Sequence, residues 1–426
     1  MKIKEINPIN TYIDVKLKAP PSKSYTHRAI FVAALSEGKS KIIDPLISDD
    51  TKYTIDSLKQ LGVKILEEPK KDGHIFKVIG SGGNLKKPVT PLYIGNSGTT
   101  LRFLMAVSSL VNGIVTIDGD QDVRKRPVKG LEDALKRLGV AIDSKKGCPP
   151  VKISSNGAIG GVTVLEARES SQYLSALLLV SPYSRPNMTI KVSGQVPSSP
   201  YVEMTLDVME QFGVSVHRKD FSEFFTSSSK YIGKDYIVEG DYSNTSYFMA
   251  IAAISGGKVT IENLNKNSKQ ADKVFVDILE TMGCEVSWSN NSLTLRGGKL
   301  KGIDIDMKKS PDIVPTLAVV SAFAKGQTKI YNIETLRFKE TDRLSAVANE
   351  LSKIGCKVEE GSDYLIITSG KLSGAEIETY KDHRMAMSFA IAGLFIEGIK
   401  ILDPDCVSKS YPNFWEDFSK ICGGIN

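Results

Sequence analysis

The amino-acid sequence predicts a mixed α/β protein built from six copies of one helix-and-strand unit. Two recurring blocks support this prediction. In one block, an amphipathic helix ends at a glycine and a strand follows; in the other, a nearly all-apolar helix leads through a short turn into a strand. With 426 residues, of which 41% are hydrophobic, the chain is long enough for two or three domains with their own cores.

The first block recurs at intervals of 77, 74, 70, 72 and 68 residues, counted from glycine to glycine. Its copies read LKQLGVKI, LKRLGVAI, MEQFGVSV, LETMGCEV, LSKIGCKV and FSKICGGI, and they contain Gly62, Gly139, Gly213, Gly283, Gly355 and Gly423. Glycine readily adopts the left-handed conformation that ends a helix, and the alternating apolar residues after it are typical of a strand. Each copy therefore predicts where a helix stops and a strand begins.

The second block lies about halfway between these glycines. Its copies span residues 23–44, 96–118, 170–192, 244–263, 311–332 and 382–403. Their helices are apolar on nearly every side, which predicts burial, and polar residues gather in their first turns. Core packing alone explains the apolar residues, so only the polar starts point to a ligand.

The last copy ends with the chain and leaves no residues for the strands that follow the other five. Residues 11–18, TYIDVKLK, have a strand-like pattern, so we expect this N-terminal strand to complete the sixth copy. Six copies then divide into two domains of three.

Composition and charge exclude several classes of protein. The difference between 55 basic and 49 acidic residues gives a net charge of +6, which suits an anionic ligand but is too diffuse to indicate nucleic acid. The five cysteines show no CxxC or Cys/His spacing, so we expect neither a disulfide set nor a metal site. The longest apolar stretch, residues 385–396, is shorter than a membrane span, and the first residues lack a signal-peptide pattern. We therefore expect a cytoplasmic protein.

The starts of the apolar helices carry groups that suit small anions. The first has Lys23, Ser24 and Arg28, and the third has Ser170, Ser171 and Gln172. The second begins with a glycine-rich run, residues 95–100, in which two glycines let a ligand approach the backbone. A helix start offers unpaired N–H groups and a partial positive charge, which favour phosphate or carboxylate. The alternative is that these side chains only cap their helices.

Three charged motifs add further candidates: RKRP at 124–127, RFKETDRL at 337–344 and YKDHRMAM at 380–387. Arg126, Arg343 and Arg384 can bind carboxylate or phosphate through two hydrogen bonds each. Lys339 beside Glu340 can combine anion binding with proton transfer. Surface ion pairs are the alternative explanation of such runs.

Ten motifs occur in order along the chain: PSKSYTHRA, GNSGTTLRF, RKRP, SSQYLSALL, SSPYVEMT, EGDYSNTSYFMA, SPDIVPT, RFKETDRL, DHRMAM and SKSYPNF. In these motifs the sequence resembles the 5-enolpyruvylshikimate-3-phosphate synthases, a family of enolpyruvyl transferases. The resemblance spans essentially the whole chain. It implies two domains of three βαβαββ repeats, arranged like an inverse α/β barrel, with a ligand cleft between them. The domains would be residues 1–19 with 236–426, and residues 20–235.

The same resemblance implies the reaction. The enolpyruvyl group of phosphoenolpyruvate would pass to the 5-hydroxyl group of shikimate 3-phosphate through a tetrahedral intermediate, with release of phosphate. This step belongs to the shikimate pathway to chorismate and the aromatic amino acids. A monomer without cofactor or metal, and without nucleic-acid or membrane partners, is expected.

Carried over motif by motif, the resemblance implies two sets of binding residues. Shikimate 3-phosphate would contact Lys23, Ser24, Arg28, Ser170, Ser171, Gln172, Ser198, Tyr201, Asp312, Thr335 and Lys339. Phosphoenolpyruvate would contact Lys23, Asn96, Gly98, Arg126, Gln172, Arg343, Arg384 and Lys409.

The chemistry requires a base for the hydroxyl proton and an acid for the methylene carbon. We assign the first role to Asp312 and the second to Glu340, which later removes the same proton. Lys23 and Lys339 complete the catalytic set, and Lys339 stabilises charge on the intermediate. His383 stays outside this set, because a histidine within a packed motif is more often structural.

Two positions depart from the usual family pattern. Thr335 stands where many relatives have asparagine near the substrate phosphate, and Phe103 stands where some have proline. Neither departure removes a group that the reaction requires. Because Gly98 is retained, the pocket should also admit glyphosate, which competes with phosphoenolpyruvate in this family.

Three other protein classes share parts of this pattern. The related UDP-N-acetylglucosamine enolpyruvyl transferases usually carry a reactive cysteine in the loop GDQDVRKRPV, which has none here. An RNA 3′-terminal phosphate cyclase shares the repeat but needs a nucleotide and a catalytic histidine, and the KETDR and GNSGTT runs argue against it. A repeat scaffold that binds polyanions would not need both Asp312 and Glu340.

Overall fold

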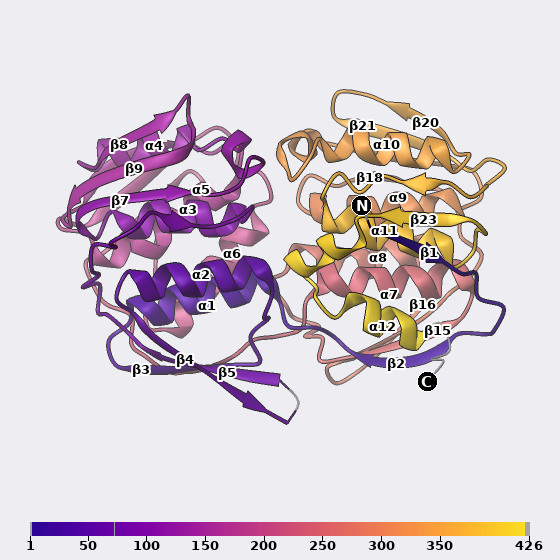
Figure 1. Cartoon of the computed structure of the whole chain (residues 1–426), viewed down its shortest axis with the longest axis horizontal. Coiled ribbons are helices and arrows are strands. Elements are labelled where there is room, and N and C mark those ends of the chain that lie inside the picture. Colours follow the sequence, from indigo (N-terminus) through magenta and orange to yellow (C-terminus); the bar gives the residue numbers. More distant parts are fainter. Residues whose placement is uncertain (1, 72, 422–426) are drawn as a thin grey trace. The chain divides into compact units, whose positions relative to one another are not determined.

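Six small mixed sheets and their helices make up the fold, which confirms the predicted mixed α/β class. The structure is a computed structural model that describes residues 2–71 and 73–421. The chain divides into two compact units. We call Met1–Pro20 with Glu239–Asn426 the terminal unit, and Pro21–Val238 the inserted unit (Figure 1).

In the inserted unit, three nearly fully buried helices form the centre and three amphipathic helices lie outside them. The buried helices are α1 (Lys23–Leu35), α3 (Gly98–Ser108) and α5 (Ser171–Val180). The outer helices are α2 (Asp49–Gln60), α4 (Lys129–Arg137) and α6 (Pro200–Gln211), and the short 3-10 helices are η1 (Val123–Lys125) and η2 (Ser181–Tyr183).

Each sheet of the inserted unit has four strands. In order across the sheet, the first contains β14 (Asp235–Ile237), β3 (Lys39–Ile43), β5 (Gly73–Ile79) and β4 (Lys64–Lys70). The second contains β6 (Leu92–Tyr93), β7 (Asn112–Asp118), β9 (Cys148–Asn156) and β8 (Ala141–Lys145). The third contains β10 (Gly161–Glu166), β11 (Met188–Ser193), β13 (Glu223–Thr226) and β12 (His217–Lys219).

The terminal unit repeats the same plan. Its buried helices are α7 (Tyr242–Ser255), α9 (Val314–Ala322) and α11 (His383–Gly393). Its outer helices are α8 (Val274–Met282), α10 (Arg343–Lys353) and α12 (Phe414–Ile421). Its 3-10 helices are η3 (Ala271–Lys273), η4 (Pro311–Ile313), η5 (Glu334–Phe338) and η6 (Pro404–Lys409).

Over residues 2–20 and 239–421, its sheets have four, four and three strands. The first contains β2 (Asp14–Lys18), β15 (Lys258–Glu262), β17 (Ser292–Arg296) and β16 (Glu285–Ser289). The second contains β18 (Asp304–Asp306), β19 (Gln327–Tyr331), β21 (Tyr364–Thr368) and β20 (Lys357–Glu360). The third contains β22 (Glu376–Ile377), β23 (Ile399–Leu402) and β1 (Ile3–Ile6).

One strand pairing is recurrent. An edge strand runs parallel to the strand that follows a buried helix, and that strand pairs antiparallel with the next, as in β10, β11 and β13. The chain turns from outer helix to hairpin at the predicted glycines. Gly62 has φ +91° and Gly139 has φ +90°, a conformation that side chains with a Cβ rarely adopt. Gly423 lies outside the described residues.

The expected partner of the N-terminal strand is wrong. Residues 14–18 of the segment 11–18 form β2, which pairs parallel with β15 in the sheet of the fourth copy, with Val15 opposite Val259. The strand beside β23 in the last sheet is β1 instead, which runs antiparallel to it with Ile6 opposite Ile399 (Figure 1). Both segments have strand patterns, and the pattern of one strand does not determine its partner.

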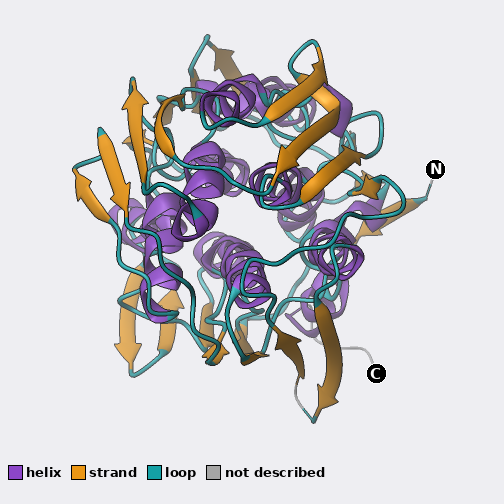
Figure 2. Ribbon diagram, turned by 90° about the vertical axis from the view of Figure 1, so that its left-hand side faces the viewer, coloured by secondary structure: helices purple, strands orange, loops and turns teal. Residues whose placement is uncertain are grey.

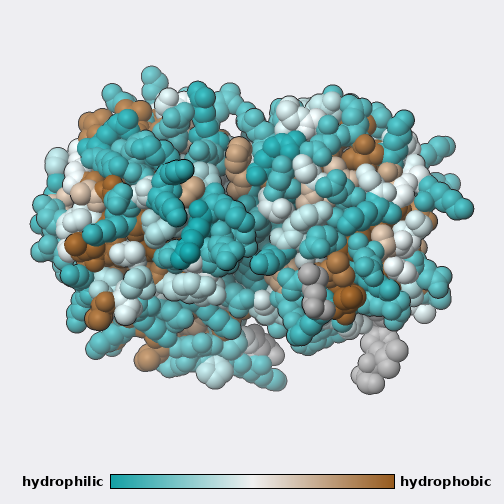
Figure 3. Space-filling model, turned by 45° about the horizontal axis from the view of Figure 1, so that its top comes forward, coloured by the Kyte–Doolittle hydropathy of each residue, from teal (hydrophilic) through white to brown (hydrophobic). Residues whose placement is uncertain are grey.

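Burial explains why the helices lie inside and the strands outside. Each unit has its own hydrophobic core, made largely of the apolar helices and the inward-facing residues of its sheets. Figure 2 shows helices on the inside and strands toward the outside. The surface seen in Figure 3 is mostly hydrophilic with small hydrophobic areas. Within the described ranges, no helix is both long enough and apolar enough to cross a membrane.

Candidate functional site

The first turn of α1 holds the cationic start that the sequence predicts. The hydroxyl group of Ser22 caps the helix by accepting a hydrogen bond from the backbone N–H of Tyr25. Lys23 begins the helix, and its ammonium nitrogen lies 3.4 Å from Oδ2 of Asp50, in the first turn of α2. The Lys23 side chain is only 16% exposed, so its ammonium group lies near the helix start and does not extend into solvent.

Arg28, one turn further along α1, is buried. Its guanidinium group donates to Thr205 Oγ1 at 2.8 Å and to the carbonyl oxygens of Ser24 and Tyr201 at 2.9 Å each. Burial lowers the pKa of Arg28 to about 10, so the group stays charged at neutral pH. These contacts join α1 to α6, and a direct contact of Arg28 with a substrate stays a prediction.

The start of α3 is packed closely against two arginines. Gly98 follows the N-cap Ser97, and a Cβ at Gly98 would lie 2.3 Å from Nη1 of Arg126 and 2.5 Å from Nη1 of Arg102. The residue before the cap, Asn96, is half-buried. Only glycine lets the guanidinium groups come this near to the helix start.

Gln172 connects the starts of α3 and α5. Its amide nitrogen donates to Thr99 Oγ1 at 3.1 Å, and its amide oxygen accepts from Arg102 at 3.1 Å. Arg102 also donates to the carbonyl oxygens of Gly98 and Pro127. These bonds bring the glycine-rich run and the SSQ motif into one polar cluster.

The remaining predicted residues of this unit lie at the starts of α5 and α6. The Ser170 hydroxyl caps α5 by accepting from the backbone N–H of Gln172 at 3.2 Å, and Ser171 is buried in the first turn. Ser198 has φ +49°, an uncommon value for serine, and its carbonyl accepts from the N–H of Tyr201 at 3.1 Å. Capping thus accounts for one of these hydroxyl groups, as the alternative explanation expects.

Arg343 is the centre of the site in the terminal unit. It begins α10 and is 1% exposed. Its guanidinium group contacts three carboxylates, namely Glu340 Oε2 at 2.6 Å, both oxygens of Asp382 at 2.8 and 3.2 Å, and Asp312 Oδ1 at 3.3 Å. Burial acts to lower the pKa of Arg343, but Asp382, Glu340 and Asp312 outweigh it and raise the pKa.

Asp312 lies among three cations. Its Oδ1 is 3.0 Å from Lys339 Nζ and 3.3 Å from Arg343, and its Oδ2 is 3.3 Å from Arg384 Nη2. Burial alone would raise the pKa of Asp312, but Lys339, Arg384 and Arg343 hold it well below its usual value. Asp312 is therefore ionised at neutral pH.

Two more predicted residues, Thr335 and Lys409, lie on elements beside this cluster, as does His383, which has no predicted role. Thr335 is in η5, just before Lys339, and its buried hydroxyl oxygen has no hydrogen-bond partner within the described part of the chain. Lys409, buried, ends η6, which packs against α11. His383 is 1% exposed at the start of α11 and 3.6 Å from Asp382.

Sequence reasoning missed several charged residues of these clusters. Arg102 and Asp382 stand inside motifs that were recognised, yet neither was assigned a role. Asp382 caps α11 by accepting from the N–H of Arg384 at 2.9 Å, and it also holds Arg343. Their signal in the sequence is a charged residue within an apolar helix block, which must be paired when buried.

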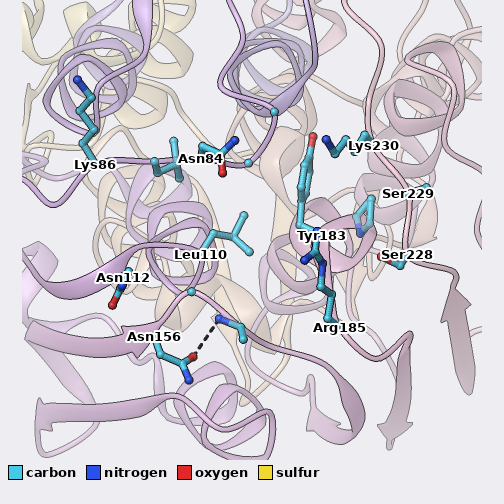
Figure 4. Close-up of a pocket in the computed structure, with 16 residues that line it drawn as sticks. Asn84, Lys86, Leu110, Asn112, Asn156, Tyr183, Arg185, Ser228, Ser229 and Lys230 are labelled. Atoms are coloured by element: carbon cyan, nitrogen blue, oxygen red, sulfur yellow. Dashed lines mark hydrogen bonds between the residues drawn. The ribbon is translucent and has the colours of Figure 1, made fainter.

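A pocket of about 870 Å³ in the inserted unit contains none of the predicted site residues. Its lining includes Leu110 and Tyr183, which follow α3 and α5, and Gly82, which donates to the Ser36 carbonyl at the end of α1, together with Lys86, Arg185 and Lys230 (Figure 4). The carboxyl end of a helix carries a partial negative charge, which disfavours anions. The predicted anion-binding residues lie at the opposite ends of these helices.

Comparisons with known proteins identify the family of the chain. Residues 8–418 match the family model of EPSP synthase (3-phosphoshikimate 1-carboxyvinyltransferase). The chain is 41% identical to a 3-phosphoshikimate 1-carboxyvinyltransferase from Colwellia psychrerythraea, over 98% of each chain. It is 42% identical to one from Methanocaldococcus jannaschii, over 93% of each. A solved structure of EPSP synthase from Acinetobacter baumannii matches with a TM-score of 0.83 at 29% identity, covering 99% of this chain and 98% of that one. The chain belongs to the EPSP synthase (3-phosphoshikimate 1-carboxyvinyltransferase) family.

Proposed function

We propose that the protein transfers the enolpyruvyl group of phosphoenolpyruvate to the 5-hydroxyl group of shikimate 3-phosphate and releases phosphate. This is a step of the shikimate pathway, which supplies chorismate and the aromatic amino acids. The observation that carries the proposal is the cluster around Arg343, where two carboxylates, Asp312 and Glu340, lie among cationic groups. Such a cluster can bind a small acid and move protons beside it.

The cationic groups are assigned to the charges of the two substrates. The helix starts of the inserted unit, with Lys23, Ser170 and Ser171, suit the phosphate and ring of shikimate 3-phosphate. The carboxylate and phosphate of phosphoenolpyruvate are assigned to three arginines. These are Arg126, which lies beside Gly98, and Arg343 and Arg384 of the terminal unit. The other residues assigned from the sequence keep their predicted places in these two sets.

In the addition step, the hydroxyl oxygen bonds to the enol carbon while Asp312 takes its proton. The electrons of the double bond move to the methylene carbon, which takes a proton from the carboxyl group of Glu340, protonated once the substrate shares Arg343 with it. In the elimination step Glu340 recovers that proton, the double bond forms again, and the bond to phosphate breaks. The proton on Asp312 leaves with the phosphate, and Lys339 stabilises charge on the intermediate.

Substrate binding adjusts Asp312 for this role. In the free protein three cations lower its proton affinity, which would make it a weak base. When the anionic substrates share Lys339, Arg343 and Arg384, the hold of these cations on Asp312 weakens and its pKa rises. The base therefore becomes effective only when both substrates are bound.

The proposal includes two domains, residues 1–19 with 236–426 and residues 20–235, that close on a cleft between them. The chain divides into two compact units, and each unit carries part of the candidate residues, which supports this proposal. Closure would exclude water from the intermediate, and small-angle scattering with and without both substrates measures it. We further propose a cytoplasmic monomer, because one chain carries every candidate residue.

The function is tested by measuring phosphate release from phosphoenolpyruvate. We expect release with shikimate 3-phosphate and none with UDP-N-acetylglucosamine, because the cluster suits a small phosphorylated acceptor. Activity with the sugar nucleotide alone would assign the chain to the other branch of the enolpyruvyl transferases.

Replacing Gly98 with alanine is expected to raise the KM for phosphoenolpyruvate by about tenfold, a loss of about 1.4 kcal/mol in binding, and to weaken inhibition by glyphosate. The new methyl group would lie 2.3 Å from Arg126 Nη1, so the guanidinium group must move. Steady-state kinetics with and without glyphosate measure both effects.

Gly139→Ala is the control for this substitution. Its methyl group meets no atom within 4 Å, but its φ of +90° is strained for alanine. It should lower Tm and leave the KM unchanged. If Gly98→Ala also left KM and inhibition unchanged, phosphoenolpyruvate would not bind beside Arg126.

A further inference from the structure

We propose that Asp272 is a positioning residue of the reaction, whose buried carboxyl group acts on the proposed base Asp312 from the neighbouring turn. Asp272 lies in η3, directly before α8, and none of the motifs found in the sequence contains it. It is 2% exposed, so water does not screen its charge. The inference rests on the function proposed above.

A hydrogen bond holds the turn of Asp272 against the turn of Asp312. The hydroxyl group of Ser310, which precedes η4, donates to the carbonyl oxygen of Ala271 at 3.0 Å. Asp312 follows Ser310 by two residues, and Asp272 follows Ala271 directly. The two carboxyl groups are therefore carried by two short turns that are bonded to each other.

The start of α7 fixes Asp272 from the other side. Ser243, in the first turn of α7, donates its hydroxyl hydrogen to Asp272 Oδ2. The neighbouring Gln270 accepts from the backbone N–H of Tyr242 at 3.1 Å and donates to the carbonyl oxygen of Gly240 at 2.7 Å. With contacts on both sides, the carboxyl group has a defined place.

Charged groups from three elements act on Asp272. Burial, the charge of Asp312 in η4 and the charge of Asp241 at the start of α7 raise the pKa of Asp272. Arg384 in α11 and the hydrogen bond from Ser243 lower it. The net result is a pKa raised to about 6. Asp272 therefore carries a proton in mild acid and is ionised above about pH 6.

The interaction between the two carboxyl groups is reciprocal. Because the charge of Asp312 raises the pKa of Asp272, the charge of an ionised Asp272 acts on Asp312 in the same sense, against Lys339, Arg384 and Arg343, which lower its pKa. Asp312 then accepts the hydroxyl proton more readily. In mild acid, where Asp272 is neutral, this assistance is absent.

The test is the pH dependence of kcat in Asp272→Asn, between pH 5 and pH 9. Asparagine keeps the size of the side chain and can still accept from Ser243. We expect kcat to fall about tenfold at pH 8, which corresponds to about one pKa unit at Asp312, and to match the unmodified protein at pH 5. Asp277→Asn, at an exposed position of α8, should change neither value.

Ser243→Ala distinguishes tuning from a structural role. Losing the hydroxyl group removes a bond that lowers the pKa of Asp272, so the pH at which kcat rises should move upward. A purely structural Asp272 would reduce kcat by the same factor at every pH and leave that midpoint in place. Either that result or an unchanged kcat would overturn the proposal.

Thermal unfolding gives a readout that does not depend on the enzyme's activity. Because the folded protein binds the Asp272 proton more tightly than the unfolded chain, stability is lost as pH rises from about 4 to about 6. Asp272→Asn should lack this loss, so its Tm should exceed that of the unmodified protein only above that range. Equal Tm values at every pH would refute the titration of Asp272 even if the proposed function were wrong.

Discussion

Arg343→Met is expected to reduce phosphate release to the limit of detection and to lower the free energy of unfolding by about 3–5 kcal/mol, the range for removing one partner of a buried ion pair. The substitution leaves the carboxylates of Asp382, Glu340 and Asp312 without the cation that they share. It also removes a proposed ligand of phosphoenolpyruvate. Urea denaturation at pH 7.5 and steady-state kinetics measure the two effects.

Arg124→Met is the matched control. Arg124 pairs with Asp118 at 2.6 Å, but its side chain is 50% exposed, and exposed ion pairs contribute little. We expect this variant to keep both its stability and its KM for phosphoenolpyruvate. A stable Arg343→Met protein with normal kinetics would show that the cluster is not the site.

Asp312→Asn is expected to lower kcat by about 10²–10⁴-fold, the usual contribution of a general base. Asparagine has nearly the same shape and cannot take the hydroxyl proton. The KM for phosphoenolpyruvate should not rise, because Lys339 and Arg384 lose an internal anion and become more available to the substrate. The separate effects on kcat and KM distinguish a base from a binding residue.

Asp306→Asn, at an exposed position of β18, is the control for Asp312→Asn.

Low pH provides a second comparison. Because the pKa of Asp312 is depressed, its ion pairs contribute stability above the usual aspartate pKa, and this stability is lost as pH falls below it. The unmodified protein and Asp312→Asn should therefore unfold at more similar temperatures in acid than at pH 7. An unchanged kcat in Asp312→Asn would assign the base elsewhere.

The sequence predicts the repeated elements well because local patterns specify them. Apolar residues on every side of residues 98–108 require a buried helix, and a glycine such as Gly62 marks its helix end by its own backbone freedom. The same local patterns do not specify long-range partners. Residues 3–6 were not recognised as a strand, and residues 14–18 were placed in the wrong sheet, because their partners lie more than 240 residues away.

The candidate site divides in the same way. Its motifs could be found in the sequence because each one is short and contiguous. Arg102, Asp382 and Asp272 were missed because their contacts are with residues of other motifs. The capping alternative holds for Ser170, whose hydroxyl group accepts a hydrogen bond from a backbone N–H, while Arg28 joins two helices.

The amino-acid order alone determines six apolar helices with polar starts, the glycines between helix and strand, and the stock of acidic and basic groups. Folding decides which of those charges share one environment. Arg343 meets Asp312 and Asp382, which are 31 and 39 residues away along the chain, only because the helices that carry them pack in a single core. Water is excluded there, so each charge acts strongly on its neighbours and proton affinities shift. Such shifts depend on distance in space, which local sequence patterns do not encode.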